Sequence, residues 1–162
     1  AAQTEAARHA DRHEHARFAF KRPAYPTAHQ LSPRLPPGGR FLGLAWLLIA
    51  PPLVNICAPN RTGISYNQFH YFDVDARGVI LNNARTVNQT ELAGQVDANP
   101  QLTREATLII NEVTQQHPSL LDGFIEVAGQ RADVIIANPA GISCSGCGFI
   151  NVRAGTLTTG HP

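Results

Sequence analysis

Short apolar runs rich in β-branched residues recur along the chain from residue 53 onward. Each run has the length of a β-strand and is bounded by Gly, Pro, Asn or Asp, the residues that interrupt strands and form turns. Only residues 112–121 could hold a helical turn, and Pro118 interrupts them. The pattern therefore predicts an all-β chain. The runs cover residues 78–83, 106–113, 123–128, 132–138 and 148–152.

Asparagine marks the ends of several of these runs. Asn82, Asn111 and Asn138 end three of them, and Asn151 follows the apolar pair of a fourth. Asn tolerates the left-handed backbone that suits a corner, and stacked amides can hydrogen-bond between equivalent strands. Among the two-residue turns typical of hairpins, Asn-Gly is absent and Asp-Gly occurs once beside these runs, at Asp122. These features favour a coiled solenoid over a meander of hairpins.

Two tetrapeptides, residues 99–102 and 138–141, open with Asn-Pro. In a type I turn the first residue is often Asn, whose side chain caps the turn, and Pro at the second position supplies the required φ. Gly is favoured at the fourth position, as in the second tetrapeptide. Both tetrapeptides are therefore predicted to form turns, whatever further role they have.

The first part of the chain has a different composition. Residues 1–40 are rich in Ala, Arg and His and then in Pro, and they are predicted to be a disordered or non-native segment. Their histidines His9, His13 and His15 are interpreted as solvated. Residues 41–52 carry an apolar run shorter than the roughly 20 residues of a membrane-spanning helix. This run fits a signal-peptide core, a cap strand or a spliced-in N-terminus, and residues 53–162 are predicted to form the folded domain.

Composition and cysteine spacing argue against nucleic-acid binding, redox catalysis and a structural zinc site. The formal net charge is +1 and 15% of the 162 residues are charged, which gives no electrostatic reason to expect nucleic acid as a partner. Cys144 and Cys147 form a C-x-x-C pair before a strand-like run, whereas redox chemistry needs a helix N-terminus. A structural zinc site needs four ligands, and Cys57, His117 and His161 are only scattered candidates. No metal and no cofactor are predicted.

No residues are spaced as a catalytic constellation. Asp73, Asp75, Glu112 and Glu126 lie within or beside predicted strands. They are interpreted as solvated turn and edge charges rather than as a carboxylate dyad. The chain is therefore predicted not to be an enzyme.

An ordered series of motifs runs through the folded part. The motifs are Pro-Leu-Val-Asn-Ile at 52–56, Gly-Ile-Ser-Tyr-Asn-Gln-Phe at 63–69, Phe-Asp-Val-Asp at 72–75, Gly-Val-Ile-Leu-Asn-Asn at 78–83, Asn-Pro-Gln-Leu at 99–102, Ile-Asn-Glu-Val at 110–113, Glu-Val-Ala-Gly-Gln-Arg-Ala at 126–132, Val-Ile-Ile-Ala-Asn-Pro-Ala-Gly-Ile at 134–142, Cys-Ser-Gly-Cys-Gly-Phe-Ile-Asn at 144–151 and Leu-Thr-Thr-Gly at 157–160. Through these motifs, residues 53–162 resemble the two-partner secretion domain, also called the haemagglutination-activity domain, of filamentous-haemagglutinin-type exoproteins, as its truncated N-terminal part.

The resemblance implies a right-handed parallel β-helix with an N-terminal cap, with the family's first strands expected to be absent or replaced by residues 1–50. The family's signature turns are Asn-Pro-Asn-Leu and Asn-Pro-Asn-Gly-Ile, and this chain has Gln101 and Ala140 in place of the second Asn of each. Some family members carry a Cys pair here, which implies a disulfide between Cys144 and Cys147 in an oxidising compartment. The turn and transporter-recognition residues carried over are Asn99, Pro100, Leu102, Asn138, Pro139, Gly141 and Ile142.

The function that the resemblance implies is secretion targeting. The module would direct a large adhesin, haemolysin or contact-dependent toxin through the periplasm of a Gram-negative bacterium to the cell surface or the medium. Its partner would be an outer-membrane TpsB/Omp85-type transporter with periplasmic receptor domains, and downstream regions would meet a host or neighbouring cell. The alternatives are a host-surface adhesin and a β-helix enzyme acting on polysaccharide, which needs acids clustered on one strand face. A stack that stops at residue 162 is expected to leave an association-prone edge near residues 148–159.

Overall fold

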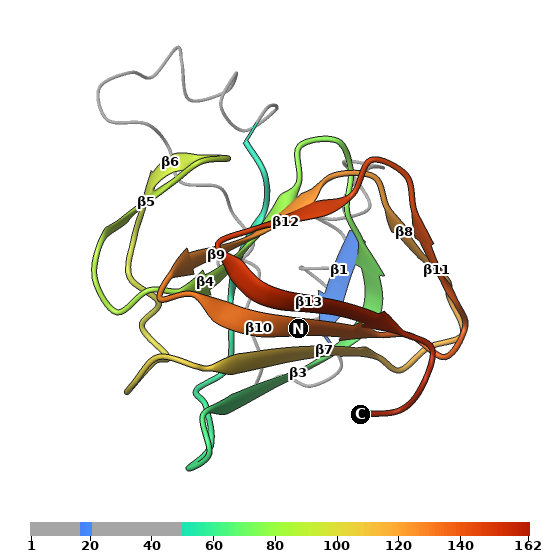
Figure 1. Cartoon of the computed structure of the whole chain (residues 1–162), viewed down its shortest axis with the longest axis horizontal. Coiled ribbons are helices and arrows are strands. Elements are labelled where there is room, and N and C mark those ends of the chain that lie inside the picture. Colours follow the sequence, from blue (N-terminus) through green and yellow to red (C-terminus); the bar gives the residue numbers. More distant parts are fainter. Residues whose placement is uncertain (1–16, 21–49) are drawn as a thin grey trace.

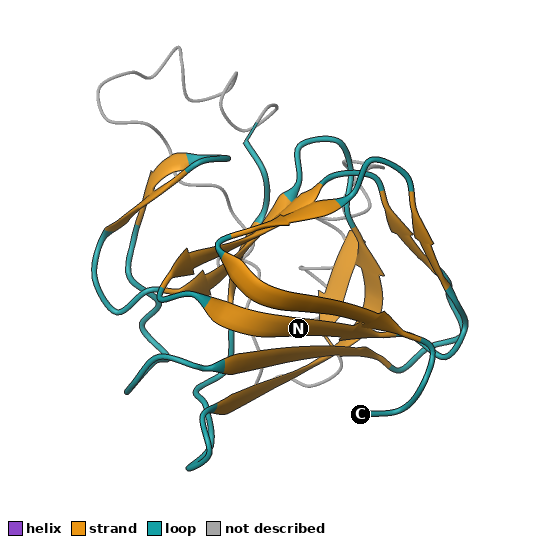
Figure 2. Ribbon diagram, viewed as in Figure 1, coloured by secondary structure: helices purple, strands orange, loops and turns teal. Residues whose placement is uncertain are grey.

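The computed structural model describes residues 17–20 and 50–162 of the chain. The regular elements of these residues are all β-strands, as the apolar runs predicted (Figure 2). Within the same residues, no helix is long and apolar enough to cross a membrane. The strands are β1 (Arg17–Phe20), β2 (Leu53–Asn55), β3 (Ile64–Asp73), β4 (Val79–Asn83), β5 (Asn88–Thr90), β6 (Gly94–Val96), β7 (Leu108–Val113), β8 (Ser119–Leu121), β9 (Phe124–Gly129), β10 (Ala132–Ala137), β11 (Ile142–Cys144), β12 (Gly148–Ile150) and β13 (Val152–Thr158).

Three parallel stacks of strands form the faces of a coil (Figure 1). The first face has the order β3-β7-β10-β13 and the second has the order β2-β4-β9-β12. The third face pairs β8 with β11, and a parallel bridge joins Val74 to Leu121 beside it. One turn of the coil, here called a rung, runs through β4, β7 and β8, and the next runs through β9, β10 and β11. The predicted parallel β-helix is therefore confirmed.

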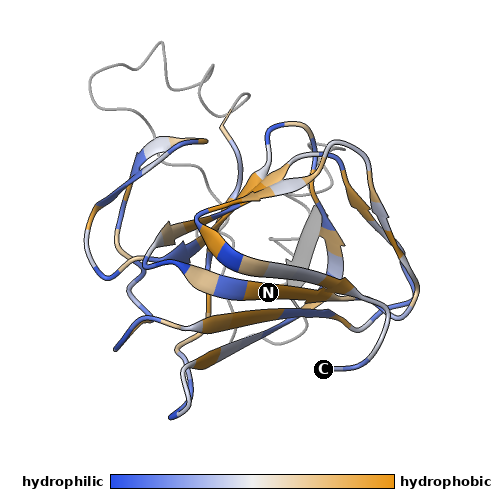
Figure 3. Ribbon diagram, in the orientation of Figure 1, coloured by the Kyte–Doolittle hydropathy of each residue, from blue (hydrophilic) through white to orange (hydrophobic). Residues whose placement is uncertain are grey.

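The strands stack so that apolar side chains of successive rungs meet inside the coil. Burial alternates along β7, and Ile109 lies opposite Val134 of β10, with both side chains fully buried. Phe69 and Phe72 fill the first rung, with ring centroids 5.1 Å apart in an edge-to-face arrangement. Figure 3 shows the apolar residues concentrated on the strands of the faces, with polar residues in the connecting turns. Each rung thus buries its apolar side only against its neighbours.

An antiparallel hairpin of β5 and β6 leaves the coil between β4 and β7 (Figure 1). It covers the outer side of the second face, where Leu53, Ile80 and Ala128 form a small second core with Val96. Leu92 and Ala93 at the tip of the hairpin pack against this core. The solenoid prediction did not include this excursion, because no Asn-Gly or Asp-Gly turn marks it in the sequence.

The N-terminal segment departs from its prediction at one place. Arg17–Phe20 form β1, which pairs antiparallel with β3 and places Arg17 opposite Asp73, so these four residues form a strand within the segment predicted to be mostly disordered or non-native. The edge of β3 offers unpaired backbone groups that any extended segment can satisfy, whatever its composition. The rest of residues 1–40, and residues 41–49, lie outside the described residues. The domain boundaries at 40 and 52 stay predictions.

Candidate functional site

The Asn-Pro turn at residues 138–141 joins β10 to β11 and has the predicted hydrogen bonds. The N–H of Gly141 donates to the carbonyl of Asn138 at 3.0 Å, and the N–H of Ala140 donates to Asn138 Oδ1 at 2.9 Å. The backbone N–H of Asn138 donates to the carbonyl of Thr158 in the next rung at 2.9 Å. The side-chain oxygen therefore caps the turn, as expected of Asn at its first position.

The amide group of Asn138 has a second role that the turn alone does not require. Asn138 Nδ2 donates to the carbonyl of His117 at 2.7 Å and to Ser119 Oγ at 2.9 Å. Asn138 and Ser119 are both fully buried. One side chain thus closes its own turn and binds the corner between β7 and β8 in the preceding rung. An Asp at this position would offer oxygen to an acceptor where Asn offers N–H, so only the amide satisfies all three contacts.

Asn99, which precedes β7, repeats this arrangement at a different corner of the coil. Its Oδ1 accepts the N–H of Gln101 at 2.9 Å, and the N–H of Leu102 donates to its carbonyl at 3.3 Å. Its Nδ2 donates to the carbonyls of Ile56 and Asn82, each at 2.9 Å. The side chain is 2% exposed. Asn99 therefore ties the ends of β2, in the preceding rung, and of β4, in its own rung, to the segment that leads into β7.

The residues of the two turn motifs differ in their exposure to solvent. Leu102 and Ile142 are half-buried and pack against the main core. Pro100, Pro139 and Ala140 are exposed. The two turns lie at different corners and do not converge on one site. A protein that binds these turns can therefore contact their second and third residues, whereas Asn99 and Asn138 are buried and inaccessible to it.

The two departures from the family motifs have different consequences. Gln101 Nε2 donates to the carbonyl of Asn55 at 3.4 Å, so the longer amide still reaches the first rung. Ala140 has no polar side chain and is exposed. The third residue of the first turn therefore makes a carboxamide contact, whereas the third residue of the second turn has no side-chain amide to make one.

Other asparagines also fasten corners, and sequence reasoning identified only some of them. Asn82 Nδ2 donates to Asn55 Oδ1 at 2.9 Å, a two-member amide ladder between paired strands. Asn83 donates to the carbonyls of Ala106 and Gln130 and accepts the N–H of Ala106. The positions of these residues at the ends of apolar runs were the available signal.

Two of the predicted corner asparagines have opposite outcomes. Asn151 lies between β12 and β13 with φ 57°, in the left-handed region, which confirms its prediction. Asn111 instead lies inside β7, fully buried, so its assignment to a corner is wrong. Its Nδ2 donates to the carbonyl of Ile135 at 3.3 Å. Glu112 and Val113 continue the strand past Asn111 because β3 and β10 supply ladder partners there, Gln68 and Ala137 for Glu112 and Phe69 for Val113.

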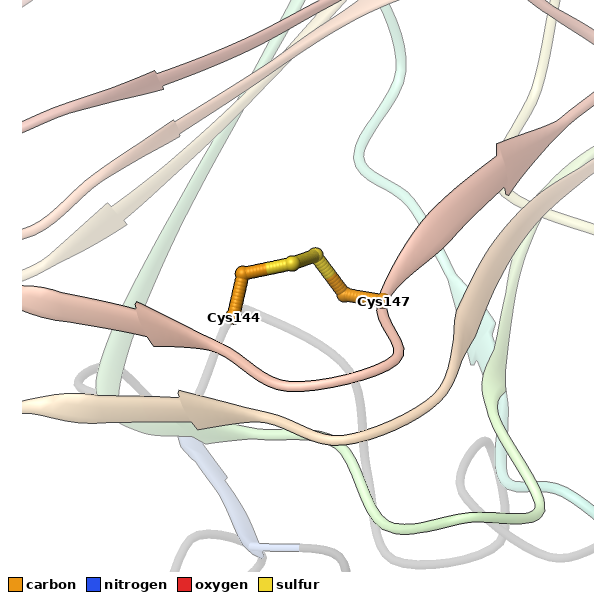
Figure 4. The surroundings of a disulfide bond; sticks show 2 residues. All are labelled: Cys144 and Cys147. Carbon is orange, nitrogen blue, oxygen red and sulfur yellow. A yellow bond between two sulfur atoms is a disulfide. The ribbon is translucent and has the colours of Figure 1, made fainter.

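Cys144 and Cys147 are joined by a disulfide at the corner between β11 and β12 (Figure 4). Their Cα atoms are 5.3 Å apart, within the range that a disulfide spans. Strand β12 follows the pair, so no helix dipole acts on Cys144. Cys57 is a free cysteine, and burial raises the pKa of its thiol to about 12. Within the described part of the chain, no three His, Cys, Asp or Glu side chains gather as a metal site.

Three of the four carboxylates interpreted as solvated are in fact buried, so that interpretation is wrong for them. Asp73 accepts the N–H of Leu120 at 2.9 Å and pairs with His117 at 3.1 Å. Asp75 pairs with Arg77 at 2.9 Å. Each acid therefore has a structural partner on its own segment or on a neighbouring rung.

Glu126 is the third buried carboxylate, with 3% of its surface exposed. Its two oxygens accept the N–H groups of Glu91 and Leu92, at 2.8 and 2.9 Å, at the tip of the hairpin. Burial raises the pKa of the Glu126 carboxyl, the two N–H groups oppose this, and the nearby Glu91 carboxylate adds to it. Glu126 thus fastens the hairpin to the second face, a contact that no local sequence signal could reveal.

Comparison with known proteins gives concordant results for sequence and structure. The family model described as TPS secretion domain matches residues 50–162. A toxin CdiA of Yersinia pestis is 62% identical over 111 residues, covering 68% of this chain and 3% of that protein. A hemolysin of Serratia marcescens is 46% identical over 126 residues, covering 77% of this chain and 8% of that protein. The chain therefore spans a small fraction of the length of these curated relatives.

A solved structure supports the same relationship. The crystal structure of a filamentous hemagglutinin secretion domain matches with a TM-score of 0.68 and 43% sequence identity. The match covers 80% of this chain and 40% of that chain.

Proposed function

Because this chain belongs to the TPS secretion domain family, we propose that residues 50–162 form the secretion-targeting module of a large exported exoprotein. The observation that carries the proposal is the family match over the whole of this folded part. The likeness to the filamentous hemagglutinin secretion domain supports it independently. The curated relatives are named as a toxin and a hemolysin, so the exported protein is proposed to be an exoprotein of that kind.

The proposed partner is an outer-membrane transporter of the TpsB/Omp85 type with periplasmic receptor domains. The module would meet it in the periplasm of a Gram-negative bacterium, before the exoprotein reaches the surface or the medium. A secretion-targeting module needs a folded surface that the transporter can bind, and it needs no catalytic residues. The buried acids Asp73, Asp75 and Glu126 each serve a structural contact, which supports a module that is not itself an enzyme.

In this proposal the two Asn-Pro turns maintain the shape of the surface that the transporter binds. Asn99 and Asn138 hold corners at which Pro100, Pro139 and Ala140 are exposed and would be accessible to the transporter. Replacing either asparagine removes three side-chain hydrogen bonds and frees the turn from the preceding rungs. Export is therefore expected to fall for Asn99→Ala and for Asn138→Ala.

The test is a secretion assay with the full exoprotein and its transporter expressed together. Removing residues 50–162 should abolish the appearance of the exoprotein in the medium, and either Asn→Ala variant should lower it. Transporter abundance in the outer membrane serves as the control. Undiminished, transporter-dependent export without residues 50–162 would refute the proposed function.

A further inference from the structure

A groove of about 380 Å³ lies against the exposed side of the turn at residues 138–141. One wall belongs to the turn itself, and the other belongs to the end of β7 and the loop that follows it. The two walls come together because β7 and β10 pair in parallel, with Ala137 opposite Glu112. The lining residues that matter here are Glu112, Gln115, Gln116, Pro139, Ala140 and His161.

The lining has the chemistry of an acceptor site for a cation. Glu112 is the one carboxylate that lines the groove. Gln115 and Gln116 are exposed and add carboxamide oxygens that can accept hydrogen bonds. Ala140 leaves the mouth of the groove open, because it carries only a methyl group where the family motif has Asn. A guanidinium or ammonium group suits the side of the groove formed by Glu112 and the two glutamines, whereas an anion there would meet the Glu112 carboxylate.

We propose that this groove receives an arginine or lysine side chain from the periplasmic part of the transporter. The inference rests on the function proposed above and names a contact for it. Asn138 is fully buried and cannot be touched, so a partner that reads this turn must do so through Pro139, Ala140 and the groove beside them. The Glu112 carboxylate then pairs with the positive charge of the partner's side chain, and the turn forms the wall against which that side chain packs.

The test measures binding of the 162-residue chain to the purified periplasmic receptor domains of its transporter by calorimetry. Glu112→Lys should weaken binding at least about 10-fold, because it places like charges together. Glu112→Gln keeps the shape and should weaken binding less. Ala140→Arg should also weaken binding, because its own guanidinium would occupy the groove beside Glu112. Raising the salt concentration should weaken the unmodified chain more than Glu112→Gln.

Asp122→Lys is the matched control for Glu112→Lys. Asp122 is exposed, lies between β8 and β9 outside the groove lining, and its replacement changes the net charge equally. This control should bind like the unmodified chain, and circular dichroism should show that every variant is folded.

Each remaining outcome decides between the two proposals. If the unmodified chain binds and Glu112→Lys and Ala140→Arg bind equally well, the groove inference is wrong and the proposed function stands. If light scattering shows that these variants abolish self-association instead, the occupant is a second copy and the inference is again wrong. If the unmodified chain does not bind and export does not need residues 50–162, both proposals fail.

Discussion

Replacing Asn138 by Ala should destabilise the protein more than its position in a surface turn suggests. The change removes two donated hydrogen bonds, to the His117 carbonyl and to Ser119 Oγ, and one accepted from the N–H of Ala140. Ala140 is exposed, so water can satisfy its N–H. Ser119 is fully buried, so its hydroxyl loses a partner that water does not replace. At a net value near 1 kcal/mol per hydrogen bond, with an added penalty for buried groups, the loss is about 2–4 kcal/mol.

This loss is large against the total stability of a domain, which is about 5–15 kcal/mol. Urea unfolding of the 162-residue chain, followed by circular dichroism, measures it. With a slope of about 1–3 kcal/mol per molar urea, the midpoint should fall by about 1–2 M. Asn138→Asp keeps the shape but removes both donors, so at neutral pH it should lose at least as much stability as the Ala variant.

Pro139→Ala is the control for this prediction. It changes the adjacent, exposed residue and leaves all three contacts of the Asn138 side chain in place. Its effect should stay within about 1 kcal/mol, through the greater freedom of the unfolded chain. Equal midpoints for Asn138→Ala and Pro139→Ala would refute the argument that the amide binds the preceding rung.

The other predictions concern the cysteines, a close backbone approach and the buried carboxylate under the hairpin. Thiol counting should find one slowly alkylated cysteine in the folded chain, Cys57, because its pKa of about 12 leaves almost no thiolate at neutral pH; reduction should release two more. Gly123→Ala should lower the melting temperature markedly, because a Cβ there would lie 2.0 Å from the carbonyl oxygen of Asp75. Because the pKa of Glu126 is raised in the folded state, its contribution to stability is fully present below pH 4.5, the ordinary pKa of a glutamate. That contribution is lost as the pH rises through the folded-state pKa. Glu126→Gln should flatten that part of the pH–stability curve.

Each of these has an outcome that contradicts it. Three fast-reacting thiols, together with bound zinc, would refute the disulfide. Gly160→Ala, where the nearest atom is a side-chain oxygen at 3.3 Å, is the control for Gly123→Ala and should melt like the unmodified chain. A pH–stability curve unchanged by Glu126→Gln would show that another group titrates in that range.

Local sequence patterns determined the strands and turns of this protein. Apolar runs bounded by Gly, Pro and Asn predicted β7, β10 and β12, because side-chain alternation and backbone preference act within a few residues. The Asn-Pro openings predicted both turns, because Pro fixes φ and Asn caps its own backbone. The resemblance of the ordered motifs then gave the parallel β-helix, which no single run could specify.

Tertiary structure alone decided where the polar groups of these elements bind. Asn111 and Asn151 both follow apolar pairs, yet one lies inside a strand and the other turns a corner. Glu126 is buried because a hairpin more than thirty residues earlier in the chain folds over it. The amide of Asn99 reaches Ile56, 43 residues away. Such contacts depend on how rungs stack, and stacking brings together residues whose separation in sequence carries no local signal.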